Sequence, residues 1–421
     1  MDNKLNYIDL FAGAGGLSEG FKRAGFEPVA HVEIDFAACQ TLTTRAAYYH
    51  LKEQGKPGIY KGYLKDEIKR QELFGHIPDE VRKSIINLGI GEVNNAEIFK
   101  KIDFQLDLKS LKDVDLLVGG PPCQAYSLVG RARSEHNMQR DPRNFLYVQY
   151  ANYLEKYKPK MFVFENVLGL KSAGGGVYLS NMERLFNKKG YKIHIFQVKA
   201  ENFGVLQKRR RLIIIGWRDD FVPNLPNLEK YSSGISSPVL NIFNDLPSLQ
   251  AGGGKDKYAS YTSETNTYLY DSNIRNGIEI LTQHISRPQN EQDKLIYKIA
   301  VEKWNENQER LNYNDLPEIL KTHKNRASFF DRFKIVADNI EASQTVVAHI
   351  AKDGHYYIHP DIEQNRSISV REAARLQSFP DDFYFEGVKE GANRTASFKQ
   401  IGNAVPPLLA EKIAMELKKI F

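Results

Sequence analysis

Residues 6–21 read NYIDLFAGAGGLSEGF, and this stretch decides the fold. A short apolar run leads directly into closely spaced glycines, and a helical pattern follows them. Glycines at such a turn permit tight backbone geometry and let a ligand lie against bare backbone. The stretch therefore predicts the first strand, turn and helix of an open α/β sheet with a nucleotide-type pocket. The alternative is that the glycines only let the helix pack closely against the strand.

Strand-like and helical segments alternate in the same way up to about residue 220. Runs such as DLLVG at 115–119 and LIIIG at 212–216 are apolar on both faces, as are strands that helices cover on both sides. We therefore predict a doubly wound, mostly parallel sheet of the Rossmann-like kind. Glu33 ends the second predicted strand, where an acidic side chain can bind both hydroxyls of a ribose. Spacing alone does not separate NAD, FAD and S-adenosylmethionine.

Changes of composition divide the chain into segments. Residues 1–220 form the first domain, interrupted by a charged, helix-prone insertion at about 48–100. Residues 221–365 are rich in Pro, Ser, Asn and Gly, and they predict a smaller, irregular second domain. The helical pattern returns in residues 366–421, which we expect to pack back on the first domain and complete it.

The overall composition is that of a soluble globular protein, with 42% hydrophobic and 26% charged residues. The 58 basic and 52 acidic residues favour nucleic-acid binding only weakly, and QKRRRL at 207–212 is the densest basic cluster. Two distant cysteines offer neither a disulfide framework nor a metal-ligand cluster, so we expect no metal. No signal peptide or membrane-spanning apolar run is visible, which favours a reducing, cytoplasmic location.

Cys123 lies in GGPPCQAYSLVGR at residues 119–131. Pro121 and Pro122 end the preceding strand and block a helix, so the thiol follows the carboxyl end of a parallel strand, where open α/β sheets bind ligands. A thiol with the reference pKa of roughly 8.5 is mostly protonated at neutral pH, and nearby cations such as the 207–212 cluster would raise the thiolate fraction. Glu165 ends another strand and either caps a helix or faces the same pocket. Cys39, within a helical segment, instead fits a small buried hydrophobe.

Seven stretches follow one another along the chain: DLFAGAGGLSEGF, GGPPCQAYS, DPRNFL, ENV, QKRRR, RSISVREAARLQSFPDDF and QIGNAVPP. Each is modest alone, but in this order they resemble the cytosine-C5 DNA methyltransferases, S-adenosylmethionine-dependent enzymes of restriction–modification type. They cover nearly the whole chain apart from the insertion and the irregular domain. One departure is Tyr126, where the family more often has phenylalanine, and a hydroxyl there should not disturb the chemistry.

The resemblance implies sequence-specific methyl transfer from S-adenosylmethionine to C5 of a cytosine flipped out of double-stranded DNA. Cys123, as a thiolate, would add to C6 and make C5 nucleophilic. Glu165 would hold N3 and the exocyclic amine of the base. Arg211 would contact the base together with its companion Arg209, although a phosphate-facing or solvated basic patch is the alternative for Arg209.

The resemblance also assigns binding residues. The cofactor set is Phe11, Gly13, Gly15, Gly16, Leu17, Glu33, Asp107, Pro122 and Asn403, with a weaker match at Asp107 because its flanking residues differ. The DNA-binding set is Gln124, Ser127, Arg131, Arg133, Arg140 and Thr345. Residues 127–143 would close over the flipped nucleotide, and the irregular domain would read the sequence in the major groove. Arg366 and Arg371 would brace the two domains.

The implied biology is protection of host DNA in a prokaryotic cell. We expect a cytoplasmic monomer that associates with the nucleoid through DNA, beside a cognate restriction endonuclease that acts on the same site without a stable complex. Three alternatives stay open. A tRNA-methylating branch shares the motifs but usually has a shorter second domain. A nicotinamide-dependent oxidoreductase would explain only the glycine turn, and an inactive DNA-binding protein would leave Cys123 and Glu165 without a role.

Overall fold

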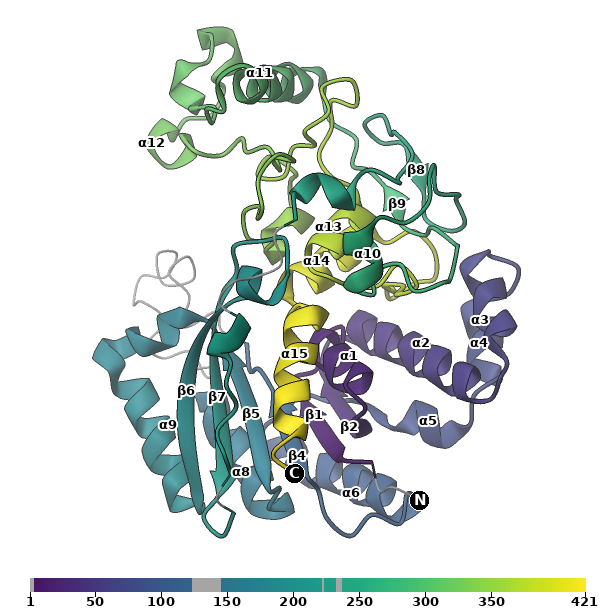
Figure 1. The fold of residues 1–421 in the computed structure, drawn as a ribbon, viewed down its shortest axis with the longest axis vertical. Coiled ribbons are helices and arrows are strands. Elements are labelled where there is room, and N and C mark those ends of the chain that lie inside the picture. Colours follow the sequence, from purple (N-terminus) through teal and green to yellow (C-terminus); the bar gives the residue numbers. More distant parts are fainter. Residues whose placement is uncertain (1–3, 123–144, 222, 232–236) are drawn as a thin grey trace.

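The computed structural model describes residues 4–122, 145–221, 223–231 and 237–421 (Figure 1). The predicted nucleophile Cys123 and the loop that follows it lie outside these residues. Outside them too lie five of the predicted DNA contacts, namely Gln124, Ser127, Arg131, Arg133 and Arg140. The described chain forms a large sheet-based part and a smaller irregular part above it (Figure 1).

Seven strands of the described chain form one sheet in the order β3-β2-β1-β4-β5-β7-β6. They are β1 (Asn6–Leu10), β2 (Glu27–Glu33), β3 (Ile85–Asn87), β4 (Leu116–Gly119), β5 (Met161–Asn166), β6 (Tyr191–Lys199) and β7 (Arg210–Arg218). Neighbouring strands from β3 to β5 are parallel, whereas β7 is antiparallel to both β5 and β6. The predicted doubly wound, mostly parallel sheet is confirmed, with an antiparallel pair at one edge.

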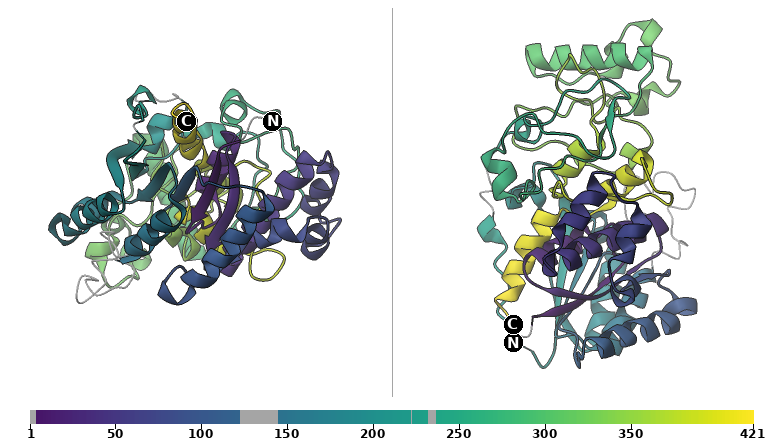
Figure 2. Two further views of the ribbon diagram at one scale, coloured as in Figure 1. Left: turned by 90° about the horizontal axis from the view of Figure 1, so that it is seen from below. Right: turned by 90° about the vertical axis from the view of Figure 1, so that its right-hand side faces the viewer.

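Helices cover both faces of the sheet (Figure 2). They are α1 (Gly16–Arg23), α2 (Phe36–Glu53), α6 (Glu92–Leu108), α8 (Leu146–Tyr157), α9 (Val177–Lys188) and α15 (Pro407–Lys418). Successive side chains of a strand point to opposite faces of the sheet, and the residues of β4 accordingly pack against different helices on the two faces. Leu117 packs in the apolar cluster that includes α6, α8 and α9, whereas Leu116 and Val118 pack in the cluster with α1 and α15.

The C-terminal helix α15 packs directly on α1, the first helix of the chain. A Cβ atom at Gly20 of α1 would lie 2.4 Å from the backbone nitrogen of Glu411, so only glycine permits this approach. A Cβ atom at Gly16 would lie 2.2 Å from the carbonyl oxygen of Val405. Residues near the end of the sequence are therefore built into the first glycine turn.

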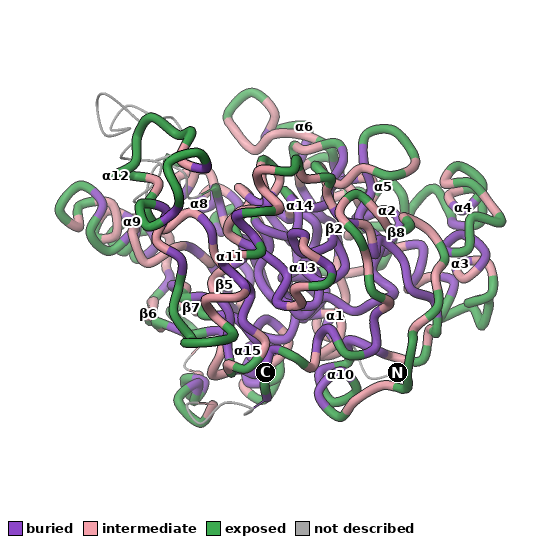
Figure 3. The backbone as a smooth tube through the Cα atoms, turned by 90° about the horizontal axis from the view of Figure 1, so that it is seen from above, coloured by how far each residue is buried: buried purple, intermediate pink, exposed green. Residues whose placement is uncertain are grey.

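Short elements make up the rest of the described chain. The insertion contributes α3 (Pro57–Leu64), α4 (Arg70–Gly75) and α5 (Asp79–Lys83), and the irregular part contains β8 (Gly254–Lys255), β9 (His284–Ile285), α10 (Thr267–Asp271), α11 (Glu291–Asn307) and α12 (Arg326–Phe329). Beneath the irregular part lie α13 (Val370–Leu376) and α14 (Arg394–Asn403). Every residue of α13 is buried (Figure 3).

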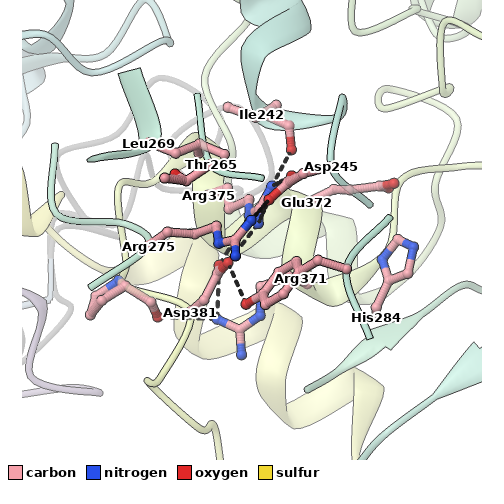
Figure 4. A network of polar contacts seen from close by, with 12 residues as sticks. Ile242, Asp245, Thr265, Leu269, Arg275, His284, Arg371, Glu372, Arg375 and Asp381 are labelled. Carbon is pink, nitrogen blue, oxygen red and sulfur yellow. Dashed lines mark hydrogen bonds and ion pairs between the residues drawn. The ribbon is translucent and has the colours of Figure 1, made fainter. Parts of the chain in front are cut away.

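A buried ionic network joins the irregular part to the C-terminal segment (Figure 4). Arg375 of α13 contacts Asp245 at 2.5 Å and Asp381 at 2.6 Å, and its side chain is fully buried. Arg371 donates to the backbone and the hydroxyl of Thr282, both at 2.9 Å. These contacts fit the predicted bracing role of Arg371, because Thr282 belongs to the irregular part.

Candidate active site

The carboxyl edge of the parallel strands gathers most of those predicted site residues that the structure describes. The glycine turn follows β1, Glu33 ends β2, and Pro121 and Pro122 follow β4. Because β7 is antiparallel to β5, the amino end of β7 lies beside the carboxyl end of β5, with Asn166 opposite Leu212. This strand direction brings the basic cluster at the start of β7 to the edge where ligands bind.

The glycine turn has backbone angles that most side chains disfavour. Gly13 and Gly15 have φ values of 56° and 85°, and Phe11 also has a positive φ of 56°. The Gly13 amide donates a 2.7 Å hydrogen bond to Glu33 Oε2. The glycines thus form a tight turn, and Gly16 admits Val405 from the C-terminal segment, a contact different from the packing of helix on strand that the sequence suggested.

Glu33 is held at the end of β2 by backbone donors on both of its carboxylate oxygens. Oε2 accepts from Gly13 and Oε1 accepts from the Asp35 amide at 2.8 Å. Burial raises the pKa of Glu33 against the opposing effect of these amide hydrogen bonds. Each oxygen keeps a second acceptor position, so the side chain is oriented and still able to accept hydrogen bonds from two hydroxyls.

The sequence interpretation missed three residues next to Glu33. Ile34 is 72% exposed and Phe36 is 46% exposed, which is unusual for large apolar side chains directly after a strand. Asn87, at the end of β3, donates from Nδ2 to the carbonyl oxygens of Glu33 and Ile34 at 3.1 and 3.0 Å. The signal in the sequence is the alternation EIDF at 33–36, which places apolar groups around the acid.

Asp107 does not lie with the other predicted cofactor residues, and we remove it from the set. It is exposed in the last turn of α6, which runs from the carboxyl edge of the sheet back towards the amino edge. Lys109, just after it, donates to the carbonyl oxygen of Pro28 at 2.8 Å. Pro28 lies near the start of β2, so Asp107 is at the edge opposite Glu33.

Glu165 and Arg211 form an ion pair at the carboxyl edge. Arg211 Nε lies 2.5 Å from Glu165 Oε1, and each side chain is 13% exposed. A Cβ atom at Gly120 would lie 2.7 Å from Glu165 Oε2, so the carboxylate is packed against the segment that leads into Cys123. Asn166 supports that segment with a 3.4 Å hydrogen bond to the carbonyl oxygen of Pro121.

Arg209, the predicted companion of Arg211, does not face this pocket. It is 1% exposed and donates to the carbonyl oxygens of Val346 at 2.7 Å and Ala404 at 2.8 Å. Those carbonyls belong to the irregular part and to the C-terminal segment. Both the base-contacting role and the phosphate-facing alternative are replaced by a bracing role for Arg209.

The remaining predicted residues lie around the same edge. Asn403 is exposed at the end of α14, next to Ala404. The Cβ atom of Ala404 would lie 3.1 Å from a Cβ atom added at Gly16. Pro122 is exposed. Leu17 is 6% exposed and packs in the cluster with α15. The Thr345 hydroxyl donates to the carbonyl oxygen of Lys208, which places this residue directly before β7.

Cys39 is buried, as its helical context predicts. Its Sγ lies 3.4 Å from the carbonyl oxygen of Glu33. Burial, reinforced by the charge of Glu33, raises the pKa of this thiol to about 12. Within the described residues no helix is long and apolar enough to span a membrane, and this part of the chain holds no cluster of His, Cys, Asp or Glu suited to a metal ion.

Comparisons with known proteins identify the family of the chain. The family model for C-5 cytosine-specific DNA methylases matches residues 5–60 and 88–419, and the unmatched stretch falls within the predicted insertion. The type II methyltransferase M.Bpa9945I of Bacillus paralicheniformis is 39% identical, over 98% of each chain. M.DdeI of Desulfomicrobium norvegicum, also a type II methyltransferase, is 29% identical over 99% of this chain and 89% of its own.

Solved structures show the same fold. A proposed DNA modification methyltransferase encoded within an E. coli prophage superimposes with a TM-score of 0.62 at 24% identity, over 99% of both chains. The Entamoeba histolytica methyltransferase EhMeth superimposes with a TM-score of 0.56 at 15% identity, again over 99% of both chains. At these identities the likeness concerns the fold alone.

Proposed function

The chain belongs to the C-5 cytosine-specific DNA methylase family and is a DNA cytosine-C5 methyltransferase, and on that premise we propose how its residues carry out the reaction. The proposed substrate is a cytosine flipped out of double-stranded DNA within a specific sequence. A transient bond between Cys123 and C6 of the base would activate C5. The observation that supports this proposal best is the Glu165–Arg211 pair, packed against the segment that leads into Cys123.

The proposed chemistry overcomes the electron-poor character of cytosine C5. The Cys123 sulfur bonds to C6, and the electron pair of the C5–C6 double bond moves onto C5 and towards N3. C5 would then bond to the methyl carbon of S-adenosylmethionine as the bond from that carbon to the sulfonium sulfur breaks; the electron pair of the broken bond would stay on the sulfur, and S-adenosylhomocysteine would leave. Finally a base removes the C5 proton, the electron pair left behind restores the double bond, and the sulfur–C6 bond breaks. Covalent attack thereby divides one difficult step into easier ones.

Glu165 and Arg211 would position the base for this attack. Arg211 contacts Oε1 of Glu165, and the other carboxylate oxygen faces Gly120. That second oxygen would accept a hydrogen bond from the exocyclic amine of cytosine. Because Arg211 fixes the carboxylate and lies at the same edge, it would also meet the base and help to stabilise the charge that develops at N3.

The residues around the glycine turn fit S-adenosylmethionine, which would supply an electrophilic methyl group. Glu33 would accept hydrogen bonds from the ribose hydroxyls, and the exposed Ile34 offers the apolar surface that a purine ring covers. Asn87 holds the backbone of both residues in place. The remaining cofactor contacts would come from Phe11, Gly13, Gly15, Gly16, Leu17, Pro122 and Asn403.

The irregular part, residues 221–365, would read the DNA sequence, with Gln124, Ser127, Arg131, Arg133, Arg140 and Thr345 as further DNA contacts. Since the curated relatives that match over their full length are type II methyltransferases, the proposed biological role is protection of host DNA against a cognate endonuclease. We propose a monomer that acts in the cytoplasm.

A mechanism-based trap tests the nucleophile. Duplex DNA of plasmid length, carrying 5-fluorocytosine in place of cytosine, is incubated with the protein and S-adenosylmethionine. Fluorine cannot leave as the C5 proton does, so we expect a denaturation-resistant adduct that peptide mass spectrometry places on Cys123. Cys39 is the internal control, because its pKa of about 12 keeps it protonated.

The matched variant is Cys123→Ser. It is expected to abolish methylation of duplex DNA while leaving S-adenosylmethionine binding largely intact. Labelled S-adenosylmethionine offered separately to DNA and to tRNA identifies the nucleic acid. The proposal fails if the adduct forms on Cys39 or not at all, if the serine variant methylates at a near wild-type rate, or if only tRNA is labelled.

A further inference from the structure

The irregular part presents a short donor-rich segment on its surface. Residues 322–328 read THKNRAS, and all of them are exposed. Apart from Ala327, every side chain in this segment carries a hydrogen-bond donor. The segment begins in a loop and continues into α12, whose N-cap Asn325 accepts from the Ser328 amide at 3.1 Å. We call residues 322–328 the reading segment.

The reading segment has a rigid support of its own. The ring of Phe329, directly after it, stacks on His323 with centroids 3.9 Å apart and planes 8° apart. Phe329 also meets the ring of Tyr313 at 4.9 Å, and the Tyr313 hydroxyl accepts from the His323 amide at 2.9 Å. The rings of Phe329 and Tyr313 belong to an apolar cluster that includes residues of α11 and is separate from the clusters of the sheet. The chain on both sides of Lys324 and Arg326 is therefore anchored by packed aromatic side chains, at His323 and at Phe329.

A second set of contacts ties the reading segment to the catalytic side. Arg332, shortly after α12, pairs with His349 and Asp353, which lie on and just after the short helix Ala348–Ala351. That helix packs tightly on α14, since a Cβ atom at Gly402 would lie 2.3 Å from the Ala348 amide nitrogen. α14 ends at Asn403, a residue of the proposed cofactor pocket. Figure 1 accordingly shows α12 on the flank that also carries β6 and α9.

Charge and side-chain type match the edges of base pairs. Lys324 is exposed and makes no ion pair within the described residues, and Arg326 pairs with the exposed Glu318 at 3.0 Å. An exposed pair of this kind contributes roughly 0–1 kcal/mol, so Arg326 can exchange Glu318 for another acceptor at little cost. Arg and Lys are the side chains that most often recognise guanine O6 and N7 in the major groove.

We propose that the reading segment enters the major groove and that Arg326 and Lys324 determine which sequence is methylated. The inference rests on the proposed DNA-methylating function and deepens it. Arg326 would release Glu318 and bind a guanine with both arms of its guanidinium. Asn325 would act as a positioning residue, because its side chain already caps α12.

Bisulfite sequencing of a random-sequence DNA library, methylated by the purified full-length protein, tests the proposal. Arg326→Ala and Lys324→Ala are compared with Arg310→Ala, an exposed arginine of the same part of the chain. We expect each of the first two to relax one position of the recognised sequence, lowering discrimination there by about 5- to 150-fold. Arg326→Lys keeps the charge but loses the bidentate fork, so it should relax the same position.

The control Arg310→Ala should leave the recognised sequence unchanged. An unaltered sequence in both Arg326→Ala and Lys324→Ala would overturn the inference. So would a uniform loss of methylation at all sequences with a weaker salt dependence, because that result indicates phosphate contacts. Failure of the proposed function gives a different result, since the wild-type protein would then leave no methylcytosine in any sequence.

Discussion

Replacing Arg375 by methionine is expected to destabilise the protein by about 3 kcal/mol. Its fully buried guanidinium lies between Asp245 and Asp381, at 2.5 and 2.6 Å. Removing one partner of a buried ion pair costs roughly 3–5 kcal/mol, because the remaining charge stays buried. We expect a loss of about 3 kcal/mol because both carboxylates keep other partners. Asp245 keeps Arg275 at 3.0 Å. Asp381 keeps the Tyr261 hydroxyl at 2.9 Å and Arg371 at 3.9 Å.

The loss in free energy of unfolding caused by Arg375→Met should depend on pH. Burial acts to raise the pKa of Asp381, but Arg375 outweighs it and the pKa is lowered overall. A carboxyl with a lowered pKa in the folded state contributes stability above its unfolded value of roughly 3.9 and loses it as the pH falls through the folded value. The variant lacks the largest part of this contribution, which comes from Arg375, and keeps the smaller parts from Arg371 and Tyr261. The difference in free energy of unfolding should therefore be complete at pH 7 and shrink below about pH 4.

Urea unfolding followed by tryptophan fluorescence measures this difference. Trp217 lies in β7 and Trp304 in α11, so one reporter lies in each part of the molecule. The matched control is Arg218→Met, which removes an exposed pair with Asp220 and should change the free energy by less than about 0.5 kcal/mol. A loss below about 1 kcal/mol for the Arg375 variant at pH 7, or a loss that is the same at pH 7 and pH 3, would refute the reasoning.

Three further predictions concern the site and its frame. Glu33→Gln should weaken S-adenosylmethionine binding about tenfold or more in calorimetry, since hydrogen bonds to a charged group contribute about 1.5–3 kcal/mol, and an unchanged affinity would remove Glu33 from the pocket. Burial lowers the pKa of His359 to about 4, so stability present above pH 6.5 should be lost as the pH falls towards 4, by up to about 3 kcal/mol. His359→Gln should flatten that profile in urea titrations, and parallel profiles would contradict the assignment. Arg211→Met should abolish methylation and lower the Tm less than Arg209→Met does, because the Arg211–Glu165 pair is partly exposed whereas Arg209 is fully enclosed; the reverse order of Tm losses would exchange their roles.

The sequence predicted those features that depend on local pattern and on the strand-end rule. Apolar runs located the central strands, and acids directly after them located Glu33 and Glu165 at one edge, because parallel strands end together there. The start of β7 was expected at the same edge, and its antiparallel direction places Arg211 there. Each of these features is determined by a few neighbouring residues, so the pattern of one sequence is sufficient to predict it.

Features that depend on distant partners were not predicted correctly. Arg209 reads as one more cation in a basic run, and only the fold brings it to the carbonyl oxygens of Val346 and Ala404, more than a hundred residues away. Asp107 was assigned by a weak resemblance to a family motif, while the short strand β3, inside the predicted insertion at about 48–100, was not recognised. The residue that meets Glu33 is instead Asn87, at the end of that strand.

Because Val405 packs against Gly16, the glycine turn is built from two segments that lie far apart in the sequence. The ribosome must therefore complete synthesis past residue 405 before the turn acquires its full wall. A chain cut or terminated ahead of that point would carry Cys123 and Glu33 yet leave the floor of the pocket open to water. Truncated products should consequently mark no DNA.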